Sequence, residues 1–195
     1  KDAAWLVDRI MSFEVTERNV RTVLEKEPAS LQEKAFATIL KNRVNRGGIL
    51  APGAGIVKRG ENEKGLLSRW YPQTLKKRIM AIHHFKDNIR FIEGDGMKVL
   101  GDYANKSDVI FFVDPPYTVA GRRLYRYSDI NHDLLFDLAS HLRGDVLITY
   151  DDADEVRYLA ERHRFHIRAV PMKSTHHVTK NELLIGRNLD WLVER

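Results

Sequence analysis

The feature that most constrains this chain is a run of four apolar residues, 110–113 (Ile-Phe-Phe-Val), that leads directly into residues 114–117 (Asp-Pro-Pro-Tyr). Such a run is typical of a short strand that is buried on both faces of a sheet. Proline lacks a backbone donor and restricts the residue before it, so we expect the strand to end at the aspartate. The tetrapeptide should then lie at the carboxyl end of a strand, where open α/β sheets place their ligand sites.

The residue types of this tetrapeptide suit chemistry on the exocyclic amino group of a base. That nitrogen is a poor nucleophile because its lone pair is delocalised into the ring. If the carboxylate of Asp114 and the carbonyl of Pro115 both accept its N–H bonds, the lone pair turns towards an incoming methyl group. Pro116 holds the backbone rigid, and Tyr117 offers a face on which a flipped base can stack. The alternative is an ordinary Asp-Pro turn after a strand.

Several segments of the chain resemble one known family, the adenine-specific DNA methyltransferases of the Dam type. The resemblance is specific at residues 114–117 and at 182–185 (Glu-Leu-Leu-Ile), and looser at 147–151 (Leu-Ile-Thr-Tyr-Asp) and 40–43 (Leu-Lys-Asn-Arg). It implies an α/β fold, a Rossmann-like methyltransferase sheet with helices on both faces. It also implies methyl transfer from S-adenosylmethionine to a flipped adenine of double-stranded DNA, in some members as part of restriction-modification. Asp114, Pro115, Pro116 and Tyr117 carry over as the catalytic residues.

A cofactor site is only partly visible in the sequence. Asp95 lies between two glycines, after an expected strand, and the resemblance implies that it and Asp114 bind the cofactor. A helix N-cap is an equally good interpretation of Asp95. The family also carries a Phe-x-Gly-x-Gly turn early in the chain, whereas residues 1–30 contain no glycine. We therefore expect the sheet to lack its N-terminal strands.

Positive charge is concentrated in one segment, residues 41–78, although the whole chain carries a net charge of only +5. Clustered cations and interspersed glycines indicate a loop-rich insertion that contacts phosphates, with a solvated surface as the alternative. We therefore predict a catalytic domain of residues 1–44 and 79–195 and a target-recognition insertion of residues 45–78. The predicted nucleic-acid contacts are Arg43, Arg46, Lys58, Arg59, Arg122, Arg123, Arg126, His177 and Lys180.

Composition excludes several other classes of protein. The chain has no cysteine, which rules out disulfides, cysteine nucleophiles and thiolate zinc sites, and its histidines show no ligand spacing, so we expect no metal. No apolar run is long enough to cross a membrane, and we expect a cytoplasmic protein. Methylation of RNA adenine and a catalytically silent nucleic-acid-binding remnant remain alternatives. A glutamine methylase is disfavoured because those enzymes carry asparagine in place of Asp114.

The apolar spacing predicts helices and strands in alternation over the second half of the chain, after a helical first part. The expected helices are residues 3–11, 16–24, 31–43, 72–84, 97–100, 132–142 and 153–163. The expected strands are residues 89–93, 109–113, 146–150, 166–170 and 183–186.

Overall fold

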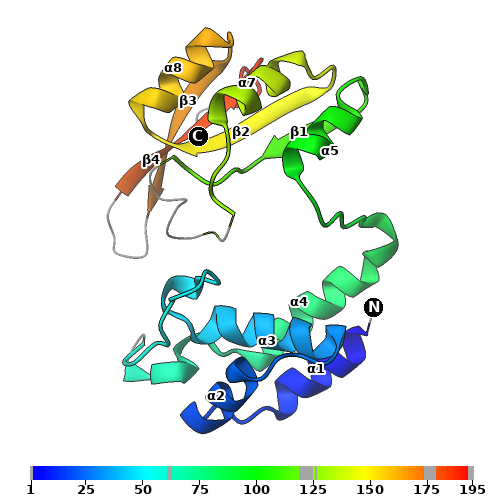
Figure 1. Ribbon diagram of the computed structural model, residues 1–195, viewed down its shortest axis with the longest axis vertical. Coiled ribbons are helices and arrows are strands. Elements are labelled where there is room, and N and C mark those ends of the chain that lie inside the picture. Colours follow the sequence, from blue (N-terminus) through cyan, green and yellow to red (C-terminus); the bar gives the residue numbers. More distant parts are fainter. Residues whose placement is uncertain (1, 61–62, 119–124, 126, 174–178, 193–195) are drawn as a thin grey trace. The chain divides into compact units, whose positions relative to one another are not determined.

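The computed structural model describes residues 2–60, 63–118, 125, 127–173 and 179–192. It divides into two compact units, Lys1–Ile92 and Glu93–Arg195. The first is helical and the second contains a sheet (Figure 1). The division into a catalytic domain and an insertion at residues 45–78 remains a prediction.

The first unit is built from four α-helices whose starts match the predicted ones. Each of the first three begins after a side chain that accepts a backbone N–H: Asp2, Thr16 and Ser30. Capping of this kind satisfies amides that have no partner inside the helix. The helices are α1 (Ala3–Ser12), α2 (Glu17–Glu25), α3 (Leu31–Val44) and α4 (Pro72–His84), with 3-10 turns η1 (Arg46–Gly48), η3 (Gly65–Arg69) and η4 (Lys86–Asn88).

Apolar side chains from these helices share one core. Phe36 and Leu40 of α3 are buried against Ile10 of α1, and Leu75 of α4 and Trp70 close the same cluster. The ring of Phe13 packs edge-on against Phe36 at 5.1 Å. Because α1 contacts both α3 and α4, the basic segment between α3 and α4 is held at its two ends by this core.

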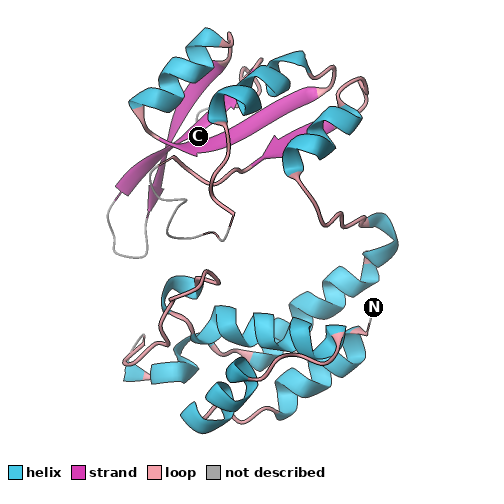
Figure 2. Ribbon diagram, in the orientation of Figure 1, coloured by secondary structure: helices cyan, strands magenta, loops and turns pink. Residues whose placement is uncertain are grey.

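The second unit contains a four-stranded mixed sheet with the order β1-β2-β4-β3 (Figure 2). β1 and β2 are parallel, and β4 runs antiparallel to both β2 and β3. All four strands were predicted. The elements are β1 (Ile110–Val113), β2 (Asp145–Asp151), β3 (His166–Lys173), β4 (Thr179–Gly186), α5 (Gly96–Tyr103), α7 (His132–His141) and α8 (Asp154–Arg162).

The helices of this unit contact one another in series, α5 with α7 and α7 with α8, and so form one layer. The prediction that β1 is buried on both faces is wrong. Phe111 points into the core at 8% exposure, whereas Ile110 is 78% and Phe112 is 66% exposed. Among the residues described for this unit, we find no second helical layer to cover that face.

The predicted strand at residues 89–93 is also wrong, because these residues form no strand and Phe91 is 85% exposed. Apolar alternation favours an extended backbone, but a strand also needs a neighbour that accepts its ladder of hydrogen bonds. The described residues supply no such neighbour here. In the described part of the chain, no helix is long and apolar enough to span a bilayer.

Phe136 of α7 is the aromatic centre of the second core. Its ring is fully buried, stacks on Tyr150 at 5.8 Å and meets Phe165 edge-on at 6.0 Å. Val156 of α8 and Ile185 of β4 belong to the same buried cluster. Helices α7 and α8 are thereby packed onto the central strands of the sheet.

We expect Phe136→Ala to destabilise this unit by about 3–5 kcal/mol, because the truncation leaves a cavity that the core fills only partly. Urea denaturation followed by circular dichroism measures the loss. Leu134→Ala, at a position 48% exposed on the same helix, is the matched control and should change stability far less. Equal effects of the two substitutions would contradict the described packing of α7.

Candidate active site

The parallel pairing of β1 with β2 determines which side chains meet at the carboxyl end of the sheet. Val113, the last residue of β1, pairs with Ile148 of β2. Asp114, which follows β1, therefore lies beside Thr149 of β2. The Thr149 hydroxyl donates a 2.7 Å hydrogen bond to Oδ1 of Asp114. Thr149 is buried and Asp114 is exposed, so a fixed donor orients a carboxylate that solvent and ligands can reach.

Tyr117 lies beside this pair. Its ring is half-buried and tilted by 34° against the ring of Tyr150, with 5.8 Å between centroids. Burial, followed by the negative charges of Asp114 and Glu182, raises the pKa of Tyr117 to about 12. The side chain is therefore a neutral phenol at physiological pH, and its ring rather than a charge is what it offers to a ligand.

Tyr150 is fully buried beneath Tyr117 and is held by a histidine. The Tyr150 hydroxyl lies 2.6 Å from Nδ1 of His132, at the first position of α7, and the two rings meet edge-on. Burial lowers the pKa of His132, against the opposing charges of Glu155 and Asp151. Burial also raises the pKa of Tyr150. Both groups are therefore neutral near pH 7, and the pair is a rigid polar support behind Tyr117.

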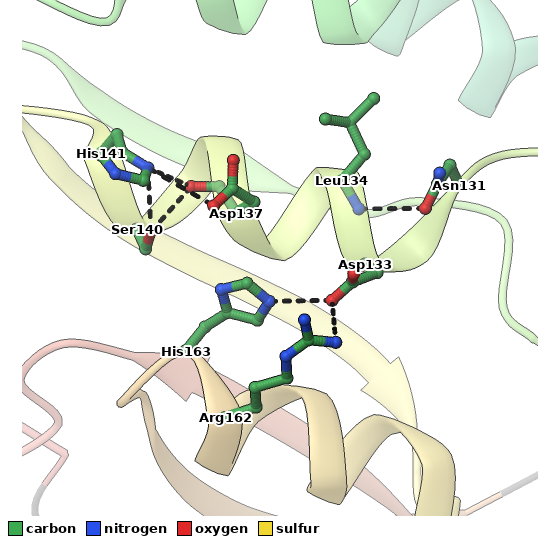
Figure 3. Close-up of polar contacts among 8 residues, drawn as sticks. All are labelled: Asn131, Asp133, Leu134, Asp137, Ser140, His141, Arg162 and His163. Carbon is green, nitrogen blue, oxygen red and sulfur yellow. Dashed lines mark hydrogen bonds and ion pairs between the residues drawn. The ribbon is translucent and has the colours of Figure 1, made fainter.

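Helix α7 is itself fixed to α8 by polar contacts (Figure 3). Asp133 accepts from Arg162 at 3.1 Å and lies 3.0 Å from Nε2 of His163. Its pKa is lowered, first by the hydrogen bond from His163. The N-cap of the helix is Asn131, whose side chain accepts from the Leu134 amide. Since His132 is the neighbour of Asp133, these contacts position the support of Tyr117.

Two charged residues lie near the same edge of the sheet. Burial raises the pKa of Asp151, at the end of β2, while a hydrogen bond from its own backbone amide and the charge of Lys180 oppose that shift. Oδ1 of Asp151 is buried and has no hydrogen-bond partner among the described residues. Asp151 is the last residue of β2 and pairs with Glu182 of the antiparallel strand β4. Lys180, which precedes Glu182 in β4, therefore lies beyond the end of β2. The structure thus brings Lys180, a predicted contact, to the end of the sheet that carries Asp114.

Asp95 is the N-cap of α5, where Oδ1 accepts the Met97 amide at 2.9 Å. This is the alternative interpretation drawn from the sequence, and the side chain is exposed. The remaining oxygen can still accept from a hydroxyl or amino group of a nucleoside, as can the carboxylate of Asp114. These two carboxylates supply acceptors that fit the hydroxyl and amino groups of a nucleoside-type cofactor, and a cofactor role for Asp95 remains a prediction. In the described part of the chain, no group of His, Asp or Glu residues could hold a metal ion.

Some of the other residues predicted to contact nucleic acid lie in the first unit, and the rest lie outside the described residues. Arg43 is half-buried in the last turn of α3, while Arg46, Lys58 and Arg59 are exposed after it. Four predicted contacts lie outside the described residues: Arg122, Arg123, Arg126 and His177.

Four residues of the site were not selected from the sequence: Thr149, Tyr150, His132 and Glu182. Thr149, Tyr150 and Glu182 fall in segments that resemble the Dam-type methyltransferases. A threonine and a tyrosine at the end of a buried strand could have indicated a polar site, because a buried hydroxyl needs a hydrogen-bond partner. Their link to the tetrapeptide depends on strand register, which the sequence does not display.

The family model of the D12 class N6 adenine-specific DNA methyltransferases matches residues 56–175 of the chain. The chain belongs to this family. The matched range contains Asp95, Asp114, Tyr117 and Thr149 and most of the basic segment. The family acts in DNA adenine methylation, and its members generally use S-adenosylmethionine. A search of curated proteins found no match.

The raised pKa of Tyr117 predicts that its phenol loses its proton at a higher pH than an ordinary tyrosine. A pKa of about 12 in the folded protein exceeds the ordinary value of 10.0, so the folded state holds this proton more tightly. The resulting stabilisation is fully present below the ordinary value and is lost as pH rises through the folded one. Absorbance at the tyrosinate band, measured in the wild type and in Tyr117→Phe, isolates this group. A difference curve with its midpoint at the ordinary tyrosine value would contradict the described environment.

Proposed function

We propose that this chain transfers a methyl group from S-adenosylmethionine to the N6 amino group of an adenine that has been flipped out of duplex DNA. The observation that carries the proposal is the Asp114 carboxylate, oriented by Thr149 beside Tyr117 at the carboxyl end of β1. The family match covers these residues. Base flipping is expected because the N6 atom cannot be reached inside a stacked duplex.

Asp114 and Pro115 are proposed to orient the amine. Thr149 engages Oδ1 of Asp114, so Oδ2 is the oxygen assigned to one N–H of adenine. The backbone carbonyl of Pro115, held between two prolines, is assigned to the other N–H. With both N–H bonds accepted, the nitrogen lone pair is directed out of the plane of the ring towards the methyl donor. This is orientation of a nucleophile by preorganised acceptors.

Tyr117 is proposed to stack on the flipped base. Tyr150 and His132 keep its ring in place from behind, which lowers the entropy lost when the base arrives. When bound, S-adenosylmethionine supplies an electrophilic methyl group, and Asp95 and Asp114 are the residues proposed to hold it. We assign target recognition to residues 45–78, with Arg43, Arg46, Lys58 and Arg59 on phosphates.

The remaining predicted contacts are assigned to the nucleotides around the target base. These are Lys180 on β4 and the undescribed residues Arg122, Arg123, Arg126 and His177. Lys180 is the one whose place in the structure supports the assignment, since its charge acts on Asp151 at the active-site edge.

We expect Asp114→Ala to abolish methylation of adenine-containing duplexes while leaving DNA binding largely intact, because the amine loses its main acceptor. Transfer of a labelled methyl group measures the first effect, and fluorescence anisotropy the second. Asp145→Ala removes an exposed carboxylate from the other end of β2 and is the matched control. Retained methylation in Asp114→Ala would contradict the proposal.

Thr149→Val should lower kcat by about 10-fold to 100-fold, because a hydrogen bond to a charged group contributes about 1.5–3 kcal/mol. The affinity for DNA should change little, since Thr149 is buried behind Asp114. Thr149→Ser keeps the hydroxyl and should restore most of the rate. If valine and serine behave alike, the hydroxyl does not orient the carboxylate.

Two further measurements separate the proposal from its rivals. Calorimetric titration with S-adenosylmethionine distinguishes an enzyme from a silent nucleic-acid-binding module, which would show no binding. Methylation of a duplex DNA and of an RNA of the same sequence distinguishes the two substrates. Transfer to RNA alone would contradict the assignment to DNA.

A further inference from the structure

A second polar region lies at the end of the sheet opposite to Asp114. His166, the first residue of β3, pairs with Gly186, the last residue of β4, and Gly186 also pairs with Leu147 near the start of β2. Asp114 contacts Thr149, near the other end of β2. Residues that follow α8 and residues that follow β4 therefore meet at the end of the sheet that is remote from the candidate active site.

A cavity of about 360 Å³ opens at this end. Its volume falls within the range of small-molecule sites, about 300–1,000 Å³. The described residues that line it include no carboxylate, and its three arginines are exposed, so a ligand can reach them from solvent. The lining residues are Ser140, Arg162, His163, Arg164 and Arg187.

Two of these arginines are held in place while most of their donors stay available. Arg162 donates to Oδ1 of Asp133 at 3.1 Å, and the same oxygen lies 3.0 Å from Nε2 of His163 (Figure 3). Nη2 of Arg187 donates to the backbone carbonyl of Gly144. A guanidinium carries several N–H donors, and within the described part of the chain each of these two uses only one of them. The others can donate to an anion in the cavity.

Arg164 has a backbone conformation that usually belongs to glycine. Its φ is +60°, in the left-handed region, where a residue with a Cβ is strained. Its amide donates to the carbonyl of Glu161 at 3.0 Å, and the amide of Phe165 donates to that of Ala160 at 2.8 Å. Helices that end with this pair of bonds most often carry glycine where Arg164 stands. Strained residues of this kind cluster at ligand sites, and this one lines the cavity.

The charge in the cavity is not balanced by the protein. Asp133 offsets the charge of Arg162, but neither Arg164 nor Arg187 forms an ion pair among the described residues. A phosphate group suits this arrangement, because its several oxygens accept from more than one guanidinium and its charge offsets their mutual repulsion.

We propose that this cavity binds a small phosphate-bearing anion through Arg162, Arg164 and Arg187. Inorganic phosphate and the phosphate end of a nucleotide share the required chemistry. The seven residues of β2 separate the cavity from the end of the sheet that carries Asp114, a length of about 20 Å. The inference therefore goes beyond the proposed methyl transfer and does not depend on it.

Arg164→Gly tests the site, because glycine suits the positive φ and the variant should melt no lower than wild type when no phosphate is present. A thermal-shift titration with inorganic phosphate, at ionic strength matched with chloride, measures binding. The melting temperature of wild type should rise with phosphate and then level off. In Arg164→Gly the midpoint of that rise should move to a concentration about 10-fold to 100-fold higher, because a charged hydrogen-bond donor is lost.

A second substitution at the same position separates the ligand from the backbone strain. Arg164→Ala keeps a Cβ at the positive φ and should lose the phosphate response as Arg164→Gly does. Arg187→Gln, checked for folding by circular dichroism, should also weaken the response. Arg157→Gln removes a charge from the same helix outside the cavity and is the matched control, with an unchanged midpoint. An unchanged midpoint in both Arg164 variants would overturn the inference, as would an equal rise produced by chloride.

Titrations with adenosine 5′-monophosphate and with adenosine identify the source of the phosphate, counting only responses that Arg164→Gly weakens. Tighter binding of the nucleotide than of inorganic phosphate assigns the site to a nucleotide, and equal binding assigns it to the phosphate group alone. Adenosine that binds as well as its monophosphate would overturn the inference. So would a loss of duplex DNA affinity in Arg164→Gly as large as its loss of phosphate affinity, because the cavity would then hold a backbone phosphate of DNA.

Discussion

The parallel pairing of β1 with β2 is the interaction on which the candidate site depends. It places the residue after Val113 beside the residue after Ile148, and so joins Asp114 to Thr149 across 35 positions of sequence. Prolines end β1 immediately after this point, because they cannot donate to the ladder. The residue that follows the strand is Asp114, whose exposed carboxylate is oriented by Thr149 of the neighbouring strand.

The core behind this edge explains why the site is preorganised. Phe136 packs under Tyr150, Tyr150 supports Tyr117, and His132 fixes the Tyr150 hydroxyl. Asp133 then holds the helix that carries His132. Each contact restricts a side chain that lies closer to Asp114 and Tyr117, so that little ordering of these residues is left to occur when a ligand binds.

Local patterns predicted most of the elements, and pairing determined the rest. Caps at Thr16 and Ser30 and the proline that begins α4 fixed helix starts, because these signals act within one turn. The strand predicted at residues 89–93 does not form, because an alternation of apolar and polar residues cannot supply a neighbouring strand to pair with. The bond from Thr149 to Asp114 could not be foreseen, because it requires a register between strands that the sequence alone leaves open. The tetrapeptide itself was predictable, since its chemistry is contained in four adjacent residues.

The products of the reaction test the proposed methyl transfer to adenine N6 most directly. The chain is incubated with S-adenosylmethionine carrying a labelled methyl group and with duplex DNA, and the nucleosides are separated and identified by mass spectrometry. We expect the label to appear in N6-methyl-2′-deoxyadenosine. Label in methylated cytosine, or cofactor that binds while every nucleoside stays unlabelled, would contradict it.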